Sequence, residues 1–94
     1  MSMNKDLIWL IRGSQRKELF LKIPENSFLP NKFRKEMNEK SNTNLSLREV
    51  SRHLSDFKNK KLIICSNPSD PYNLIYQLTP KGKKIQGILS KLSI

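Results

Sequence analysis

Four hydrogen-bonding side chains recur along one stretch of the chain at intervals of four, three and four residues. They are Arg48, Arg52, Ser55 and Asn59. An α-helix turns by about 100° per residue, so this spacing places all four side chains on one side of a helix. An arginine guanidinium offers two-pronged donors that match phosphate oxygens or the edge of guanine, a geometry that lysine cannot make. The alternative is an ordinary solvated face, with Arg48 paired to a nearby carboxylate.

The segment that carries this stripe has strong signals for a helix over residues 46–60. Ser46 and Glu49 form a capping box, in which the serine hydroxyl accepts the N–H of the third helical residue and the glutamate reaches back to the serine N–H. Leu45, just before the cap, is expected to pack against Val50 as a hydrophobic staple. The opposite side of the helix carries apolar residues that are predicted to face the core: Leu47, Val50, Leu54 and Phe57.

The chain offers no set of residues for catalysis or metal binding. His53 is the only histidine, and Cys65, the only cysteine, does not lie at a metal-ligand spacing from it. A single cysteine also excludes an intrachain disulfide. The acidic residues are dispersed, and there is no glycine-rich phosphate loop. The sequence therefore predicts a protein that is not an enzyme and that uses no metal or cofactor.

The chain is strongly basic, with 18 lysines and arginines against 8 acidic residues and a formal net charge of +10 over 94 residues. A small domain with this charge typically binds a polyanion such as DNA, RNA or an anionic membrane surface. The alternative is that solvated lysines simply cover the surface. The longest apolar run, residues 7–11, is too short to span a bilayer and no signal-peptide cleavage site follows it. We therefore expect a cytoplasmic protein with no membrane partner.

Three segments precede the capped helix. Residues 6–13 are apolar, and their periodicity fits a short helix or a strand. Residues 14–23 are predicted to form a helix with Ser14 as its N-cap. Residues 29–40 are predicted to form a second helix with Pro30 at its first position. One face of that second helix is apolar: Leu29, Phe33 and Met37.

After the capped helix, two short β-rich runs, residues 62–65 and 74–79, predict an antiparallel hairpin around a turn-rich loop. Thr79 as N-cap and Pro80 at the first position predict a last helix. Its apolar stripe is Ile85, Ile88, Leu89 and Leu92.

This order of elements predicts an α+β, mainly helical fold, a winged helix-turn-helix with a three-helix core, a β-hairpin wing and a C-terminal helix. We expect a single domain over residues 1–94. Its parts are an N-terminal apolar segment (1–13), helices one to three (14–61), the wing (62–79) and the C-terminal helix (80–94).

Two phrases flank the predicted wing: NLSLREVSRHLSDFKNKKLIIC before it and LIYQLTPKGKKI after it. The pattern is carried by Val50, Ser51, Arg52, Leu54, Phe57, Lys60 and Leu62 in the first phrase, and by Tyr76, Leu78, Thr79, Lys81, Gly82 and Lys83 in the second. Over roughly residues 14–89 the chain resembles the small archaeal winged-helix regulators, related in layout to the MarR and ArsR groups. The resemblance implies a DNA-binding transcription regulator that places helix 46–60 in the major groove of double-stranded DNA.

The residues expected to touch DNA fall into two sets. Base contacts are predicted for Ser46, Arg48, Ser51, Arg52 and Ser55. Contacts to the DNA backbone are predicted for Asn31, Lys32, Lys35, Lys58, Asn59, Asn67 and Tyr72. Ser51 lies at the edge of the stripe and could instead pack against the preceding helix. A further basic cluster either holds phosphate or is simply solvated: Lys81, Lys83 and Lys84.

The predicted wing departs from the family pattern. Its loop, SNPSDPYN over residues 66–73, has no basic residue and contains Asp70, whereas the usual wing tip carries an arginine or lysine for the minor groove or for phosphate. The lack of a basic residue in the wing loop favours a competing function, a winged-helix protein-interaction module of a larger complex. A third possibility is a non-specific nucleic-acid-binding protein.

Apolar residues at both ends of the chain, in LIWLI (7–11) and IQGILSKLSI (85–94), exceed what a wing and three helices need. We expect these segments to form a homodimer, because in related regulators such ends bring two recognition helices to successive major grooves. The alternative is that Trp9 and Leu92 cover the core of a single small domain.

Overall fold

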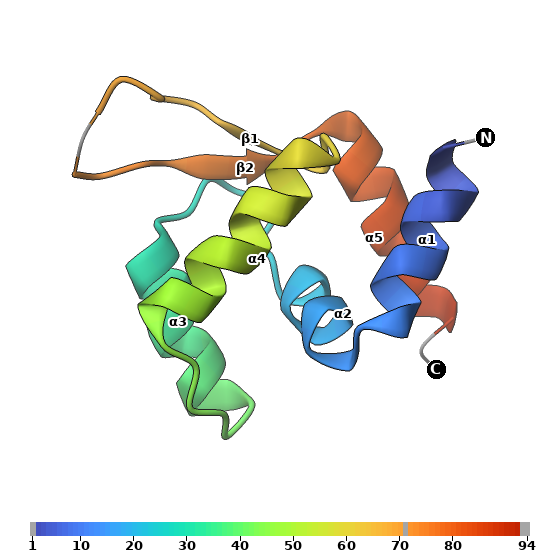
Figure 1. Ribbon diagram of the computed structural model, residues 1–94, viewed down its shortest axis with the longest axis horizontal. Coiled ribbons are helices and arrows are strands. Elements are labelled where there is room, and N and C mark those ends of the chain that lie inside the picture. The colour runs from blue at the N-terminus through green and yellow to red at the C-terminus, as the bar shows by residue number, and fades with distance from the viewer. Residues whose placement is uncertain (1, 71, 93–94) are drawn as a thin grey trace.

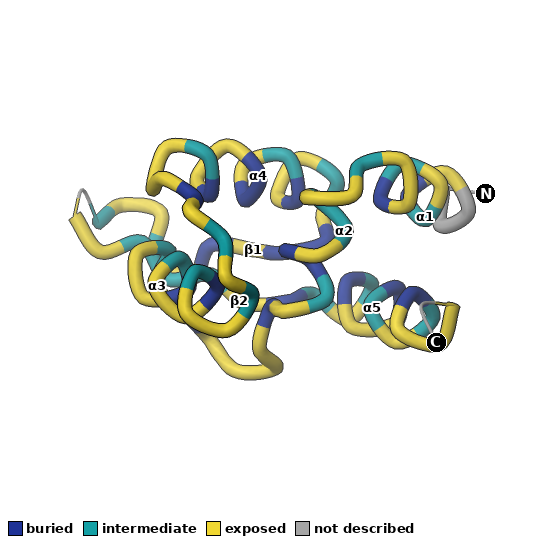
Figure 2. The backbone as a smooth tube through the Cα atoms, turned by 90° about the horizontal axis from the view of Figure 1, so that it is seen from below, coloured by how far each residue is buried: buried dark blue, intermediate teal, exposed yellow. Residues whose placement is uncertain are grey.

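The computed structural model describes residues 2–70 and 72–92, which form five helices and one two-stranded antiparallel sheet (Figure 1). In chain order the elements are α1 (Ser2–Arg12), α2 (Ser14–Leu21), α3 (Pro30–Lys40), α4 (Leu47–Asn59), β1 (Ile63–Cys65), β2 (Tyr76–Leu78) and α5 (Pro80–Leu92). Helix α3 and the wing loop lie at one end of the molecule, and α1 and α5 lie at the other (Figures 1 and 2). Ser93 and Ile94, part of the predicted apolar C-terminal segment, lie outside the described residues.

The N-terminal apolar segment is a helix, which settles the choice that its periodicity left open. Leu10 on α1 is fully buried in the core, and the half-buried Trp9 packs edge-on against Phe57 of α4 with 6.0 Å between ring centroids. On α5, Ile85 and Leu89 are buried but Leu92 is exposed. Trp9 therefore covers the core, whereas Leu92 does not. Among the described helices, none is long and apolar enough to cross a membrane.

Two helix boundaries differ from the sequence-based expectation at α2. The N-cap is Gly13, with extended backbone and no side-chain capping bond, so the prediction of Ser14 as the cap was wrong. The helix also ends at Leu21, two residues early, because Lys22 and Ile23 donate their N–H groups in a tightened last turn. Pro30, by contrast, occupies the first position of α3 as predicted.

The start of α4 is fixed by the predicted capping box and by a bond network from α3. Ser46 Oγ accepts the Glu49 N–H at 3.1 Å, and the Glu49 carboxylate accepts the Ser46 N–H at 3.2 Å. Asn38 of α3 binds both backbone groups of Leu45: its Oδ1 accepts the Leu45 N–H at 2.8 Å, and its amide donates to the Leu45 carbonyl at 3.0 Å. The turn between the two helices is thereby held in one geometry.

The core face of α4 differs from the prediction at one position. Val50, Leu54 and Phe57 are buried as expected, but Leu47 is 44% exposed, so its assignment to the core was wrong. Leu47 lies at the first turn, at the margin of the buried stripe, and Leu45 is buried just before the cap instead. His53 is the further buried residue of this face, and its Nε2 lies 3.0 Å from Gln15 Oε1 on α2.

The wing is shorter than the two β-rich runs. Residues pair in the register Ile63–Leu78, Ile64–Gln77 and Cys65–Tyr76. Phe28, just before α3, pairs with Tyr76 on the other edge of β2 by two backbone bonds of 2.8 and 3.0 Å. This bridge ties the segment before α3 to the wing. Cys65 is buried and forms no disulfide, and its thiol donates to Asn67 Oδ1 at 3.7 Å.

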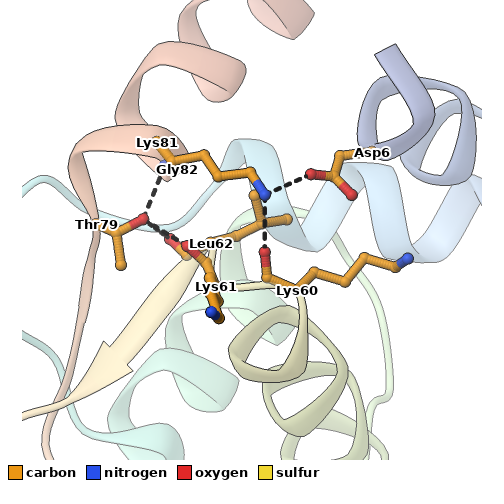
Figure 3. A network of polar contacts seen from close by, with 7 residues as sticks. All are labelled: Asp6, Lys60, Lys61, Leu62, Thr79, Lys81 and Gly82. Atoms are coloured by element: carbon orange, nitrogen blue, oxygen red, sulfur yellow. Dashed lines mark hydrogen bonds and ion pairs between the residues drawn. The ribbon is translucent and has the colours of Figure 1, made fainter. Parts of the chain in front are cut away.

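The end of α4 and the start of α5 are joined by a polar network that also reaches α1 (Figure 3). Thr79 Oγ1 accepts the Gly82 N–H at 2.9 Å, which confirms Thr79 as the cap of α5, and donates to the Lys61 carbonyl at 2.7 Å. Lys81 Nζ forms an ion pair with the buried Asp6 at 2.9 Å and donates to the Lys60 carbonyl at 3.2 Å. Lys81 is therefore part of the fold and not of a free basic cluster.

Candidate nucleic-acid interface

The outward stripe of α4 is solvent-exposed as the spacing predicted. Arg48, Arg52, Ser55 and Asn59 are all exposed. Within the part of the chain that the structure describes, neither guanidinium makes a hydrogen bond or an ion pair. The alternative in which Arg48 pairs with a nearby carboxylate, such as that of Glu49 or Asp56, is therefore not seen among the described residues. The two arginines thus stand one helical turn apart with all their donors open to an external acceptor.

Glu49 and Ser46 serve the helix start. The backbone N–H of Ser46, and then its hydroxyl, stabilise the Glu49 carboxylate and lower the pKa of that group. Ser46 Oγ also donates to Glu49 Oε1 at 3.1 Å while it accepts the Glu49 N–H. Both hydrogen-bonding roles of the Ser46 hydroxyl are thus in use within the capping box. Of the residues predicted to contact bases, Ser46 is the one whose side chain is already committed.

A groove of about 460 Å³ opens beside the first turn of α4, bounded by the start of α3 and by the wing loop. Its lining brings together five residues predicted separately as DNA contacts: Asn31, Lys32, Lys35, Ser51 and Tyr72. Ser51 is exposed in this groove and is not packed away against α3. The structure therefore brings these five predicted positions on α3, α4 and the wing to one groove, whereas Arg48, Arg52 and Ser55 on α4 do not line it.

Asn31, one of the residues that line the groove, already accepts hydrogen bonds within α3. Asn31 Oδ1 accepts from Arg34 Nε at 3.1 Å and from Arg34 Nη2 at 2.9 Å. Arg34 is thus a further cation close to the groove, and it is not among the predicted DNA contacts. The three-residue spacing of Asn31 and Arg34 was the available signal, since side chains three apart meet on a helix. Lys32 and Lys35 make no hydrogen bond or ion pair within the described residues.

The wing loop uses most of its polar groups to close itself. Asn67 Oδ1 accepts the Ile75 N–H at 2.6 Å, and Asn67 Nδ2 donates to the Asn73 carbonyl at 2.7 Å. The Asp70 carboxylate accepts the N–H groups of Tyr72 and Asn73 at 2.8 and 2.9 Å, and these bonds, Asn73 first, lower the pKa of Asp70. Asp70, which departs from the basic wing tip of the family pattern, therefore closes the turn of this loop.

Two predicted wing contacts differ accordingly. The Asn67 side chain is committed to the loop, whereas the Tyr72 side chain is 89% exposed. Tyr72 is the wing residue with a free aromatic ring and hydroxyl at the groove. No described residue of the loop carries a positive charge.

The remaining basic residues divide by their surroundings. Lys58 is exposed near the end of α4, and Lys83 and Lys84 are exposed on α5. Lys60 lies over the Trp9 ring, with its Nζ 4.9 Å from the centroid, and Arg16 stacks on the same ring at 4.2 Å. Among the described residues no three His, Cys, Asp or Glu side chains gather in a way that could hold a metal ion.

Comparison with known proteins identifies the fold. Neither the patterns of known protein families nor the sequences of curated proteins match this chain. The structure is similar to that of the protein hsRosR-SG, solved in a complex, with a TM-score of 0.71 and 20% sequence identity over 86% of this chain and 73% of that chain. At this identity the likeness concerns the fold, and it confirms the winged helix-turn-helix predicted from the order of elements.

Proposed function

We propose that this chain is a DNA-binding transcription regulator of the archaeal winged-helix type, with a MarR- and ArsR-like layout, acting in the cytoplasm. In this proposal α4 lies in the major groove of double-stranded DNA. The observation that carries it is the pair of exposed, unpaired guanidinium groups of Arg48 and Arg52 on a helix whose ends are both fixed. In a helix-turn-helix the first part of the second helix reads base edges.

The contacts we propose follow the two predicted sets. Arg48 and Arg52 would pair with guanine edges, and Ser51 and Ser55 would add single hydrogen bonds from the same side of α4. Ser46 would contribute through its position at the helix start, since its hydroxyl already serves the cap. Backbone phosphates would be held by exposed side chains on α3, on the end of α4 and on the wing: Asn31, Lys32, Lys35, Lys58, Asn59 and Tyr72. Asn67 would support the wing loop rather than touch DNA freely.

The test is selection of bound sequences from a pool of random duplex DNA at near-physiological salt. The wild-type chain should enrich one motif, and Arg48→Ala/Arg52→Ala should lose it. Lys83→Ala/Lys84→Ala is the matched control, because it removes the same charge from exposed positions that lie on α5 and not on the outward stripe of α4. Retention without a motif would instead support a non-specific nucleic-acid-binding protein, with a steep salt dependence.

We also propose that the regulator is a homodimer. Ile8 and Ile11 on α1 and Leu92 on α5 are exposed apolar residues, and α1 packs beside α5 at the end of the molecule away from α3 and the wing loop (Figure 1). A twofold dimer through this end would present two α4 helices to successive turns of the duplex. Sedimentation of the wild type and of Ile8→Ser/Ile11→Ser tests this: the wild type should sediment as a dimer and the variant as a monomer.

A second candidate function is a protein-interaction module. It is favoured by the wing loop, which lacks a basic residue and in which the side chains of Asn67 and Asp70 form hydrogen bonds within the loop. This function predicts that the selection retains no duplex at all, and that Arg48→Ala/Arg52→Ala changes nothing in that experiment.

A further inference from the structure

Leu47 is an exposed apolar residue on α4, where the other exposed side chains are polar. It is the first residue of α4, it is 44% exposed, and Arg48 follows it directly. The spacing of four residues puts Leu47 beside Ser51, and both line the groove between α3, α4 and the wing. An apolar side chain left in water at this position contributes nothing to the core, where Leu45 is buried instead.

The surroundings of Leu47 indicate what covers it. The same groove is lined by Lys32 and Lys35, and both are exposed without a partner in the part of the chain that the structure describes. The negatively charged phosphate backbone of a nucleic acid complements these two lysines. Duplex DNA supplies that backbone, and in its major groove it also exposes one apolar group, the C5-methyl of thymine. Lys32 and Lys35 in the same groove match the phosphates, and Leu47 itself matches the methyl group.

We propose that Leu47 is a specificity-determining residue that packs against the C5-methyl group of a thymine in the recognised site. The inference rests on the proposed function, since it names a base that α4 would read. Leu47 donates no hydrogen bond, so its discrimination comes from burying the methyl group against an apolar surface. Cytosine and uracil present a hydrogen at the same position and gain nothing from Leu47.

The experiment uses the duplex enriched by the wild-type chain, with each thymine replaced in turn by deoxyuridine. This exchange removes one methyl group from the major groove and leaves base pairing unchanged. At the contacted position, the wild type should bind the deoxyuridine duplex about fourfold more weakly, the factor that corresponds to about 0.8 kcal/mol for burying one such group. Leu47→Ala should bind the thymine duplex more weakly than the wild type and should bind the two duplexes equally.

Leu29→Ala is the matched control, because Leu29 is a leucine of similar exposure, 38%, that lines the same groove from just before α3. This variant should keep the fourfold preference for thymine. Thermal melts of both variants should match the wild type, because both residues are outside the core.

The inference would be overturned by an enriched motif in which no thymine shows a methyl effect. It would also be overturned if Leu47→Ala kept the wild-type preference, or if Leu29→Ala lost it. In each of these results the enriched motif itself would still support the proposed function. Failure of the wild-type chain to enrich any motif would overturn the proposed function, and this inference with it.

Discussion

Replacing Lys32 and Lys35 together by alanine should reduce the salt dependence of DNA binding by an amount that follows from their surroundings. Both lysines project from the first turns of α3, both line the groove beside α4, and neither has a partner within the described residues. Lys81 differs, since its ammonium is already neutralised by the buried Asp6. We therefore expect Lys32 and Lys35, but not Lys81, to displace counterions from phosphates.

The magnitude follows from counterion release. Each phosphate that a lysine neutralises adds about 0.9 to the slope of log K against log salt concentration. Losing two such contacts should lower the slope by about 1.8 for each protomer bound. Over a fourfold rise in salt, from about 50 to about 200 mM, the wild type should then lose about 12-fold more affinity per protomer than the double variant. A dimer on two half-sites would double the change in slope to about 3.6.

The assay is fluorescence anisotropy with the enriched duplex at a series of salt concentrations, with stoichiometry set by sedimentation. Lys83→Ala/Lys84→Ala removes the same formal charge from α5 and should leave the slope close to that of the wild type. Equal slopes for the wild type and Lys32→Ala/Lys35→Ala would refute the assignment of these lysines to phosphates. An equal reduction in both double variants would refute the groove as the place of contact, since net charge alone would then explain the effect.

Three predictions concern stability. Gly82→Ala should destabilise the fold by about 3 kcal/mol, because the added Cβ would lie 2.0 Å from the Leu62 carbonyl oxygen. Gly87→Ala should stabilise the fold, because a Cβ there would meet no atom within 4 Å and alanine favours the helix. Urea unfolding measures both variants. Lys61→Gly should raise the free energy of unfolding by about 0.5 kcal/mol, since Lys61 has φ 62° just after α4, and unchanged stability would count against this. Burial lowers the pKa of His53 from 6.5, so the unfolded chain binds the proton more readily. Stability should be full above the unfolded pKa, about 6.5, and decrease as the pH falls through it; melts of His53→Gln should lack this decrease.

Local signals in the sequence were sufficient where a helix end is decided by neighbouring residues. The capping box of Ser46 and Glu49, Pro30 at the start of α3, and Thr79 before α5 all formed as predicted. Each of these depends on bonds within a few residues, so the surrounding fold has little influence on it. The outward direction of Arg48 and Arg52 also followed, because it depends only on helical periodicity and on the buried face opposite.

The positions that the sequence did not predict depend on contacts between distant segments. Leu47 and Leu45 were both predicted to pack inward, but only Leu45 is buried, and its backbone is held by bonds from Asn38, seven residues earlier. The sequence placed Lys81 in a basic cluster with Lys83 and Lys84, whereas in the structure it pairs with Asp6, which is far away in the sequence. The groove itself needs three segments to meet, and no periodicity within one segment describes that meeting.

The bonds that fix α4 and the side chains that remain free to bind DNA belong to different parts of the helix. Its start is fixed by the capping box and Asn38, its middle by the contact of His53 with Gln15, and its end by the network of Thr79 and Lys81 around residues 60–62. Only the side chains of the outward face remain free, so DNA binding would have to order those side chains and not the helix backbone, which lowers the entropic cost of association. Substitutions in the holding bonds should therefore change stability with little change in which bases are preferred. Substitutions at Arg48 or Arg52 should change base preference with little change in stability, and a variant that moved both quantities together would show that α4 is not preorganised.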